Sequence, residues 1–175
     1  CADSRKAGLL LRPDSTAMVA AICATASGAG IGIVPQGGLT GLVDGTATAP
    51  DQIALSLERM TRILRVDPTQ GVILAEAGCT IQAMNEAAAE YGLMTGIDIP
   101  SRGSCTLGGV IATNAGGIRV IRYGNTREWI AGLKVVTGAG ELLELNKALV
   151  KNSSGYDLRH LFIGAEGTLG IVVEA

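Results

Sequence analysis

Aromatic residues and basic clusters are both scarce in this chain. Its 175 residues include one tryptophan, three tyrosines and one phenylalanine, so aromatic side chains make up 3% of the sequence. The 14 lysines and arginines are scattered and are outnumbered by 16 acidic residues, which gives a formal charge of −2. Proteins that bind DNA or RNA need a basic surface to neutralise the phosphate backbone. The sequence therefore argues against a nucleic-acid partner.

Metal-binding and membrane-spanning patterns are missing as well. The cysteines Cys1, Cys23, Cys79 and Cys105 are far apart, and His160 is the only histidine. Such scattered ligands do not make a tetrahedral zinc site, so we expect free thiols and no metal. No apolar run reaches the ~20 residues that cross a bilayer, and no charged leader opens the chain. We expect no transmembrane segment and a cytoplasmic location, peripheral to a membrane at most, and the chain reads as part of a longer protein.

Glycine, in contrast, is abundant, with 25 residues, or about twice the average frequency. Residues 35–43, the first glycine segment, read Pro-Gln-Gly-Gly-Leu-Thr-Gly-Leu-Val and follow an apolar run at 31–34 that is typical of a buried strand. Glycine permits positive φ angles and lets a ligand approach the backbone. Successive amides in such a turn form an anion site, to which Thr40 adds a hydroxyl donor. The segment predicts a phosphate or pyrophosphate site, with a plain turn between strands as the alternative.

Two common phosphate-binding motifs do not fit the first glycine segment. No Gly-x-x-x-x-Gly-Lys-Ser/Thr occurs anywhere in the chain, which excludes the lysine-bearing phosphate loop. Gly37, Gly38 and Gly41 have the wrong spacing for the dinucleotide fingerprint, and no helix is predicted directly after them. Any phosphate here is therefore bound by a loop of another kind.

Two further segments share this composition. The middle glycine segment, residues 100–117, contains five glycines with short hydroxyl and amide side chains between them. The third glycine segment, residues 164–170, reads Gly-Ala-Glu-Gly-Thr-Leu-Gly and precedes a strand-like apolar run. Three such stretches suit an extended ligand that lies against backbone over a long path. They predict a ligand larger than a mononucleotide.

Hydrophobic periodicity indicates a mixture of helices and strands. Hairpins are expected where Asp67-Pro68-Thr69-Gln70 and Gly138-Ala139-Gly140 separate apolar runs, and these hairpins argue against a purely parallel sheet. Thr80 is the expected cap of a helix that ends near Gly92. The predicted helices span about 16–28, 80–91 and 157–162, and the predicted strands 31–34, 53–57, 63–66, 71–77, 130–137, 141–145 and 171–173.

Taken together, these segments resemble the flavin-binding domain of the vanillyl-alcohol-oxidase-like family, also called the p-cresol-methylhydroxylase type. The branch of greatest similarity contains the glycolate oxidase FAD subunit, D-lactate dehydrogenases and D-2-hydroxyglutarate dehydrogenases. The matching runs are Pro-Gln-Gly-Gly-Leu-Thr-Gly (35–41), Gly-Ser-Cys-Thr-Leu-Gly-Gly (103–109), Ala-Thr-Asn-Ala-Gly-Gly (112–117), Arg-Tyr-Gly (122–124) and residues 155–171. The likeness covers nearly the whole chain in order.

The resemblance implies an α+β fold of two lobes with FAD between them, about 1–78 and about 79–175, and a C-terminal substrate domain absent from this chain. The first glycine segment would receive the pyrophosphate, the middle one would follow the ribityl chain and isoalloxazine, and the third would close over the nucleotide side. The implied cofactor-binding residues are Pro35, Gln36, Gly37, Gly38, Leu39, Thr40, Gly41, Leu42, Gly103, Ser104, Cys105, Gly108, Gly109, Thr113, Asn114, Gly116, Glu166, Gly167 and Ile171.

Some members of the resembled family bond the flavin covalently through a histidine or a cysteine. Here Leu39 occupies the matching loop position, and Cys105 reads as a small buried packing residue. We therefore expect noncovalent FAD. His160 has no evident carboxylate partner and reads as a surface or capping histidine, while Arg102, Arg119 and Arg122 read as solvated or structural. No catalytic residue is assigned.

The function that the resemblance implies is oxidation of a D-2-hydroxy acid by hydride transfer to flavin N5. Lactate, glycolate and 2-hydroxyglutarate are all compatible substrates, and the electron acceptor stays open. Because the resembled enzymes take their base and metal ligands mainly from the C-terminal domain, this chain alone is expected to bind FAD without turnover. The alternatives are a non-catalytic flavin-binding or structural subunit of a glycolate-oxidase-like complex, and a nucleotide-sugar reductase of the same superfamily.

Overall fold

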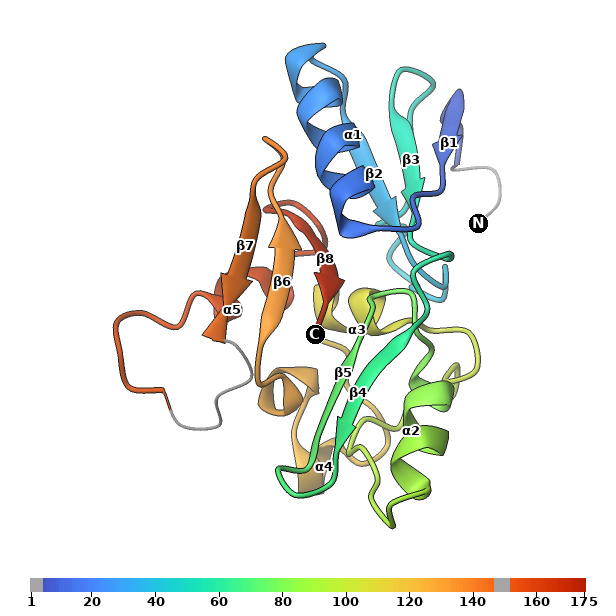
Figure 1. Ribbon diagram of the computed structural model, residues 1–175. Coiled ribbons are helices and arrows are strands. Elements are labelled where there is room, and N and C mark those ends of the chain that lie inside the picture. Colours follow the sequence, from blue (N-terminus) through green and yellow to red (C-terminus); the bar gives the residue numbers. More distant parts are fainter. Residues whose placement is uncertain (1–4, 147–151) are drawn as a thin grey trace.

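The computed structural model describes residues 5–146 and 152–175. Its N-terminal part is a small parallel sheet in the order β1-β3-β2, beside which helix α1 runs (Figure 1). The bounds are β1 Leu9–Leu11, α1 Thr16–Gly28, β2 Ile33–Gln36 and β3 Ile53–Ser56. Because all three strands are parallel, their carboxyl ends share one edge, and such edges are where α/β sheets bind ligands.

Helix α1 forms over the range predicted for it, with an N-cap residue and apolar residues at helical spacing. Ser15 is the N-cap, and its hydroxyl accepts a hydrogen bond from the N–H of Met18. Val19, Cys23 and Ala26 recur at helical spacing and are buried against the rest of the protein. The predicted helix is therefore confirmed.

The remaining strands form two antiparallel groups. One is a hairpin of two strands, and the other is a three-stranded sheet in the order β7-β6-β8. Asp67 closes the first hairpin by accepting a hydrogen bond from the N–H of Gln70, as its turn residues predict. The bounds are β4 Ile63–Asp67, β5 Val72–Ala75, β6 Leu133–Val136, β7 Leu142–Leu145 and β8 Ile171–Glu174.

Strand β8 connects these two antiparallel groups. Ala75 and Ala175 exchange two backbone hydrogen bonds of 2.9 and 3.0 Å, and the N–H of Ala77 donates to the carbonyl of Val173. The chain end therefore lies between β6 and the β4–β5 hairpin (Figure 1). The division into lobes near residue 78 stays a prediction.

Short helices surround the antiparallel strands. Helix α2 is capped by Thr80, whose hydroxyl accepts from the N–H of Ala83, and Gly92 follows its end with φ of 68°. The described helices here are α2 Ile81–Ala89, α3 Leu107–Ala112, α4 Val120–Tyr123, the 3-10 helix η2 Thr126–Trp129 and α5 Arg159–Phe162.

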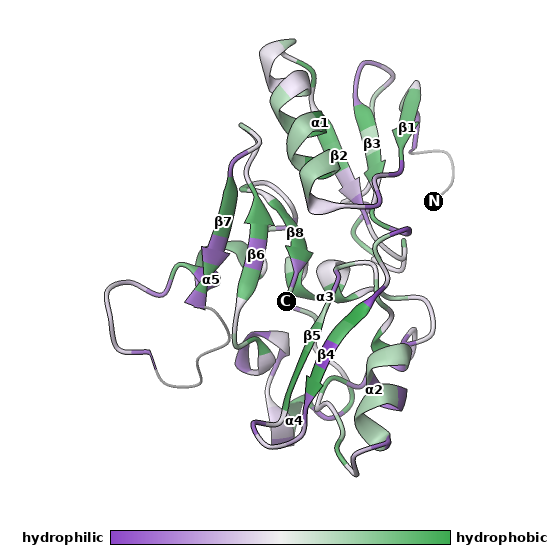
Figure 2. Cartoon of the chain, viewed as in Figure 1, coloured by the Kyte–Doolittle hydropathy of each residue, from purple (hydrophilic) through white to green (hydrophobic). Residues whose placement is uncertain are grey.

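One apolar core runs through both parts of the molecule. It contains Val19 and Leu55 from the parallel part, Met60 from the connection, and Leu107 and Val135 from the antiparallel part. The strands carry most of this apolar surface, and the loops are more polar (Figure 2). The mixed α and β architecture that the sequence predicted is confirmed.

Several elements differ from the sequence-based predictions, and the short helices α4 and η2 were not predicted at all. The strand predicted at 31–34 is shifted, because β2 begins at Ile33 and continues through Pro35 and Gln36. Helix α3 was not predicted, since Gly108 and Gly109 each lower intrinsic helix propensity by about 1 kcal/mol. Strand β1 was also missed, because three leucines are too short a run to show a period.

Candidate functional site

The structure brings the three glycine segments together. A Cβ built on Gly38 would overlap the carbonyl oxygen of Ser104, so the first and middle segments touch backbone to backbone. A Cβ on Gly167 would lie 2.6 Å from the Pro35 ring, which places the third segment against the start of the first. The N–H of Glu166 donates to the carbonyl of Ala112 at 2.8 Å and joins the third segment to the end of α3. Residues more than 120 positions apart therefore form one site.

The first glycine segment offers a row of unused donors. It leaves the carboxyl end of β2, and in the described structure the N–H groups of residues 38–43 have no hydrogen-bond partner. Leu39, Thr40, Gly41 and Leu42 are exposed there. Backbone amides that are exposed and unpaired at the end of a strand are the donors that a phosphate accepts from.

For the middle glycine segment, the sequence predicted an extended ligand that lies along the backbone. Most of its amides are already bonded within the protein, for example the N–H of Gly108 to the carbonyl of Ala77 at 2.8 Å. Thr113 donates its hydroxyl to the carbonyl of Gly109, and Asn114 accepts from the N–H of Arg127 at 3.0 Å. Among the described residues, five N–H groups of this segment outside the helix have no hydrogen-bond partner, those of Ser101, Gly103, Thr106, Gly116 and Gly117. This segment therefore supplies a surface more than a set of donors.

Thr106 is the residue of this site that the sequence analysis did not select. Its hydroxyl is buried, has no hydrogen-bond partner in the described structure and lies against the backbone of Gly37 and Gly109. A buried polar atom without a partner is costly unless a ligand or water satisfies it. The only indication of Thr106 in the sequence was its position between two glycines that were predicted to bind the cofactor.

Backbone strain marks the same three segments. Leu39, Asn114 and Glu166 have φ of 55°, 45° and 52°, a region that non-glycine residues rarely adopt. One strained residue therefore lies in each glycine segment. Strain of this kind clusters at ligand sites, where the surrounding structure enforces it.

Some of the predicted cofactor-binding residues are buried and not exposed at the surface of the site. Gln36, Cys105, Gly108 and Ile171 are buried. Burial raises the pKa of the Cys105 thiol, which keeps it protonated and unreactive at neutral pH. The packing role predicted for Cys105 agrees with this environment.

The expectation that His160 has no carboxylate partner is wrong. Its Nε2 lies 3.3 Å from Asp157, and its Nδ1 lies 2.8 Å from the guanidinium of Arg127. Asp157 is itself paired with Arg159, whose hydrogen bonds lower the pKa of the Asp157 carboxyl to about 2. Both ring nitrogens are occupied, so the histidine has no free position from which to take a substrate proton. These two contacts, which the sequence did not reveal, favour a structural role for His160.

The arginines that flank the middle segment have partners in the protein. Arg102 and Arg119 both pair with Asp98, at 3.5 and 2.9 Å. The Arg122 guanidinium lies 5.3 Å from the centre of the Tyr123 ring. These contacts support the structural interpretation of all three.

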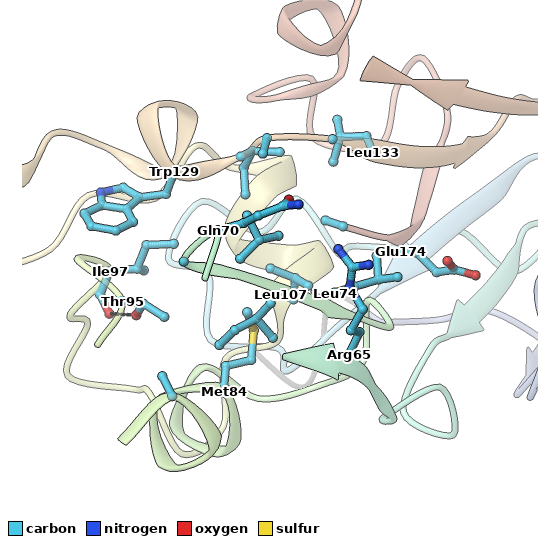
Figure 3. A pocket seen from close by; sticks show the side chains of 18 of the residues that line it. Arg65, Gln70, Leu74, Met84, Thr95, Ile97, Leu107, Trp129, Leu133 and Glu174 are labelled. Carbon is cyan, nitrogen blue, oxygen red and sulfur yellow. Dashed lines mark hydrogen bonds between the residues drawn. The ribbon is translucent and has the colours of Figure 1, made fainter. Parts of the chain in front are cut away.

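Two hollows lie near these elements. A small one of about 280 Å³ is lined by Pro35, Gly167 and Ile171 together with residues of α1. A larger one of about 710 Å³ lies at the other end of β8, at Glu174 and Ala175, and is lined by no residue of the first or third glycine segment (Figure 3). Only the small hollow therefore belongs to the site built by these two segments.

Other kinds of site find no support in the described residues. No group of three or more histidine, cysteine or acidic side chains within residues 5–146 and 152–175 is placed to hold a metal ion. Cys23, Cys79 and Cys105 are free thiols, and Cys1 lies outside the described residues. No described helix is both long and apolar enough to cross a bilayer.

The comparisons with known proteins agree with this site. A family described as FAD binding domain matches residues 7–146. D-2-hydroxyglutarate dehydrogenase of Xanthomonas citri pv. viticola is 58% identical over 163 residues, 93% of this chain and 34% of the relative. The mitochondrial D-2-hydroxyglutarate dehydrogenase of Bos taurus is 42% identical over 94% of this chain and 30% of its own length. An alkyldihydroxyacetonephosphate synthase structure matches with a TM-score of 0.83 and 27% identity, covering 95% of this chain and 32% of its own.

The chain belongs to the FAD binding domain family. The predicted family, the fold class and FAD as the cofactor are thereby confirmed. The chain spans about a third of the length of the curated relatives it matches. The individual cofactor-binding residues and noncovalent attachment stay predictions.

Proposed function

We propose that this chain is the flavin-binding part of an FAD-dependent dehydrogenase that oxidises D-2-hydroxyglutarate. The observation that carries the cofactor site is the row of unpaired amides at residues 38–43, where the three glycine segments meet. The substrate assignment rests on the relatives, of which the Xanthomonas protein is 58% identical and is named for D-2-hydroxyglutarate.

The described residues fit FAD by their chemistry. A diphosphate needs several convergent donors, which the amides of the first glycine segment and the hydroxyl of Thr40 supply. The Glu166 carboxylate lies close to Gly45, two residues after the first segment, since a Cβ on Gly45 would be 3.2 Å from its Oε2. A carboxylate only accepts hydrogen bonds, so Glu166 suits a sugar hydroxyl of FAD and not a phosphate. The unsatisfied hydroxyl of Thr106 is the donor that remains at the contact between the first and middle segments.

When bound, FAD supplies a ring that accepts a hydride from the substrate. This chain's own contribution is to hold and orient the cofactor. The described residues provide no histidine with a free nitrogen and no group of metal ligands. In this proposal, the base and the groups that bind the substrate carboxylates come from the part of the protein that the relatives have in addition.

Gly41 offers a direct test of the cofactor site. Nothing lies within 4 Å of a Cβ at Gly41 or at Gly28, and neither residue has a positive φ. Gly41→Ala therefore leaves the fold intact but places a methyl group on the proposed phosphate loop, and we expect FAD affinity to fall about tenfold or more. Gly28→Ala, at the end of α1, is the matched control and should bind FAD like the parent chain. FAD affinity is measured by titration of flavin absorbance. Equal affinity in both variants would show that this loop does not bind the phosphate.

A chimera tests the activity. Joined to the remaining two thirds of the Xanthomonas relative, the chain should reduce an artificial electron-accepting dye with D-2-hydroxyglutarate in preference to D-lactate and glycolate. A chimera that retains FAD yet oxidises none of the three acids would instead support the alternative of a non-catalytic flavin-binding subunit.

A further inference from the structure

The 3-10 helix η2 connects the middle glycine segment to the start of the third. The backbone N–H of Arg127, in η2, donates to the side-chain oxygen of Asn114 at 3.0 Å. The hydroxyl of Thr126, which is buried, donates to the carbonyl of Ala115 at 2.8 Å. The half-buried side chain of Arg127 then reaches the carbonyl of Ile163, directly before the third segment, with its Nη2 at 2.6 Å. Arg127 therefore bonds on both sides of the contact between the two segments, although it belongs to neither.

The backbone that Arg127 connects is strained. Asn114 in the middle segment and Glu166 in the third have φ of 45° and 52°. The two segments also bond to each other through the N–H of Glu166 and the carbonyl of Ala112. A Cβ on Gly164 would lie 3.4 Å from the Cβ of Asn114 and 3.5 Å from Nη2 of Arg127, so the guanidinium lies beside this contact. Strained backbone persists only where the surrounding structure enforces it, and Arg127 supplies part of that enforcement.

His160 holds the same guanidinium in place. Nη1 of Arg127 donates to Nδ1 of His160 at 2.8 Å and to the backbone carbonyl of His160 at 3.2 Å. Because a guanidinium only donates, Nδ1 must be the acceptor, so the other ring nitrogen carries the proton and faces Asp157 at 3.3 Å. The acceptors of the Arg127 side chain are thus two carbonyls and an imidazole, none of which is an anion. These contacts use the planar fork of N–H groups more than the positive charge.

We propose that Arg127 is a positioning residue of the FAD site. It holds the middle and third glycine segments in the arrangement that binds the cofactor, and His160 is the acceptor that fixes its guanidinium. The inference rests on the proposed function, because it requires FAD to contact both segments. In it, Arg127 acts through Asn114 and Ile163 and not by touching FAD. If this contact were loose in the free chain, FAD would have to order it on binding, and that cost lowers affinity.

Arg127→Lys tests the inference most directly. Lysine keeps the charge and the long stem but lacks the planar fork that reaches Ile163 and His160 together. We expect FAD affinity, measured by titration of flavin absorbance, to fall about tenfold because these hydrogen bonds are lost. Amide exchange at Glu166 should become faster in the absence of FAD, because its hydrogen bond lies at the loosened contact.

Arg62→Lys is the matched control. Arg62 also joins two elements through its guanidinium, but its partner is Glu76, next to β5, and not a glycine segment. The control should lower the free energy of unfolding, measured with urea, and still bind FAD like the parent chain. A loss of stability without a change in FAD affinity is what a merely structural arginine gives.

A pair of substitutions at His160 covers the case in which Arg127→Lys does not fold. His160 is exposed, so changes there spare the core. Asparagine and leucine have the same branched shape, but only asparagine offers an oxygen near the position of Nδ1. We expect His160→Asn to bind FAD within about twofold of the parent chain and His160→Leu to bind about threefold to tenfold more weakly, because only the second loses the acceptor for Arg127.

FAD affinity equal to that of the parent chain in Arg127→Lys, or in His160→Leu where Arg127→Lys does not fold, would overturn the inference and leave the proposed function standing. So would an equal loss of affinity in Arg62→Lys, since affinity would then follow general stability. A parent chain that binds no FAD would contradict the proposed function itself, and this inference with it.

Discussion

Gly38 and Gly41 lie three residues apart in one loop, yet they are glycines for different reasons. Gly38 packs its Cα against the carbonyl of Ser104, whereas nothing lies near Gly41. We therefore predict that Gly38→Ala lowers the free energy of unfolding by about 1–3 kcal/mol even without FAD, because a methyl group there forces the backbone apart. Urea unfolding of Gly38→Ala and Gly41→Ala, both without flavin, checks this. Equal stability of the two variants would mean that the contact with Ser104 is not made.

Leu39 and Cys105 decide how the flavin is attached. The aliphatic side chain of Leu39 cannot form a covalent bond to the flavin ring. The Cys105 thiol is buried, and its pKa is raised. We predict that acid precipitation of the FAD-loaded chain leaves all yellow colour in the supernatant. Colour that stays with the precipitated protein, and is lost in Cys105→Ser, would show a covalent bond to that sulfur.

At the scale of single elements, the pair formed by Arg62 and Glu76 joins the start of β4 to the residue that follows β5. Glu76 is 2% exposed, and its carboxylate accepts hydrogen bonds from the side chain and the backbone N–H of Arg62. Burial alone would raise the pKa of Glu76, but these hydrogen bonds outweigh it, so the pKa is lowered. The pair therefore stabilises the fold above the pKa of an unfolded glutamate, about 4.3, and this contribution is lost as the pH falls below it.

Glu76→Gln tests this pair. The variant should lose about 1–3 kcal/mol of unfolding free energy at pH 7, because a charged hydrogen-bond acceptor is removed from a buried position. It should also lose stability less steeply than the parent chain between pH 5 and pH 3. Parallel pH profiles of the two proteins in urea unfolding would show that Glu76 does not titrate in that range.

Local signals predicted most elements of this fold, and long-range packing explains the rest. Thr80 indicated the start of one helix and Asp67 a turn, because each acts within three residues of itself. Helix α3 was hidden by Gly108, whose missing Cβ is needed where α3 packs on Ala77. The contact between Ala75 and Ala175 joins residues 100 positions apart, which no periodicity reveals.

The cofactor site could likewise be predicted only in part from the sequence. The glycine segments were recognised from their composition, but their meeting depends on contacts such as that between Gly167 and Pro35. The sequence suggested donors along all three segments, whereas most amides of the middle segment bond within the protein. Thr106 and the partners of His160 were missed because each depends on residues distant in the sequence.

At the scale of the whole molecule, the site is formed by three separate segments of the chain, which no single helix or strand joins. A ligand that touches all three binds only the folded state, so it stabilises the fold by mass action. We predict that FAD at about one hundred times its dissociation constant adds about 2.7 kcal/mol to the free energy of unfolding. Thermal unfolding with increasing FAD checks this, and a Tm independent of FAD would contradict binding to the folded chain.

The central claim is that the amides of residues 38–43 bind the pyrophosphate of FAD. The most direct test is amide hydrogen exchange of these six residues with FAD, with ADP and with riboflavin, which lacks phosphate. The account predicts that FAD and ADP slow exchange at these amides and that riboflavin does not. Saturable FAD binding that leaves all six amides exchanging as before would contradict it.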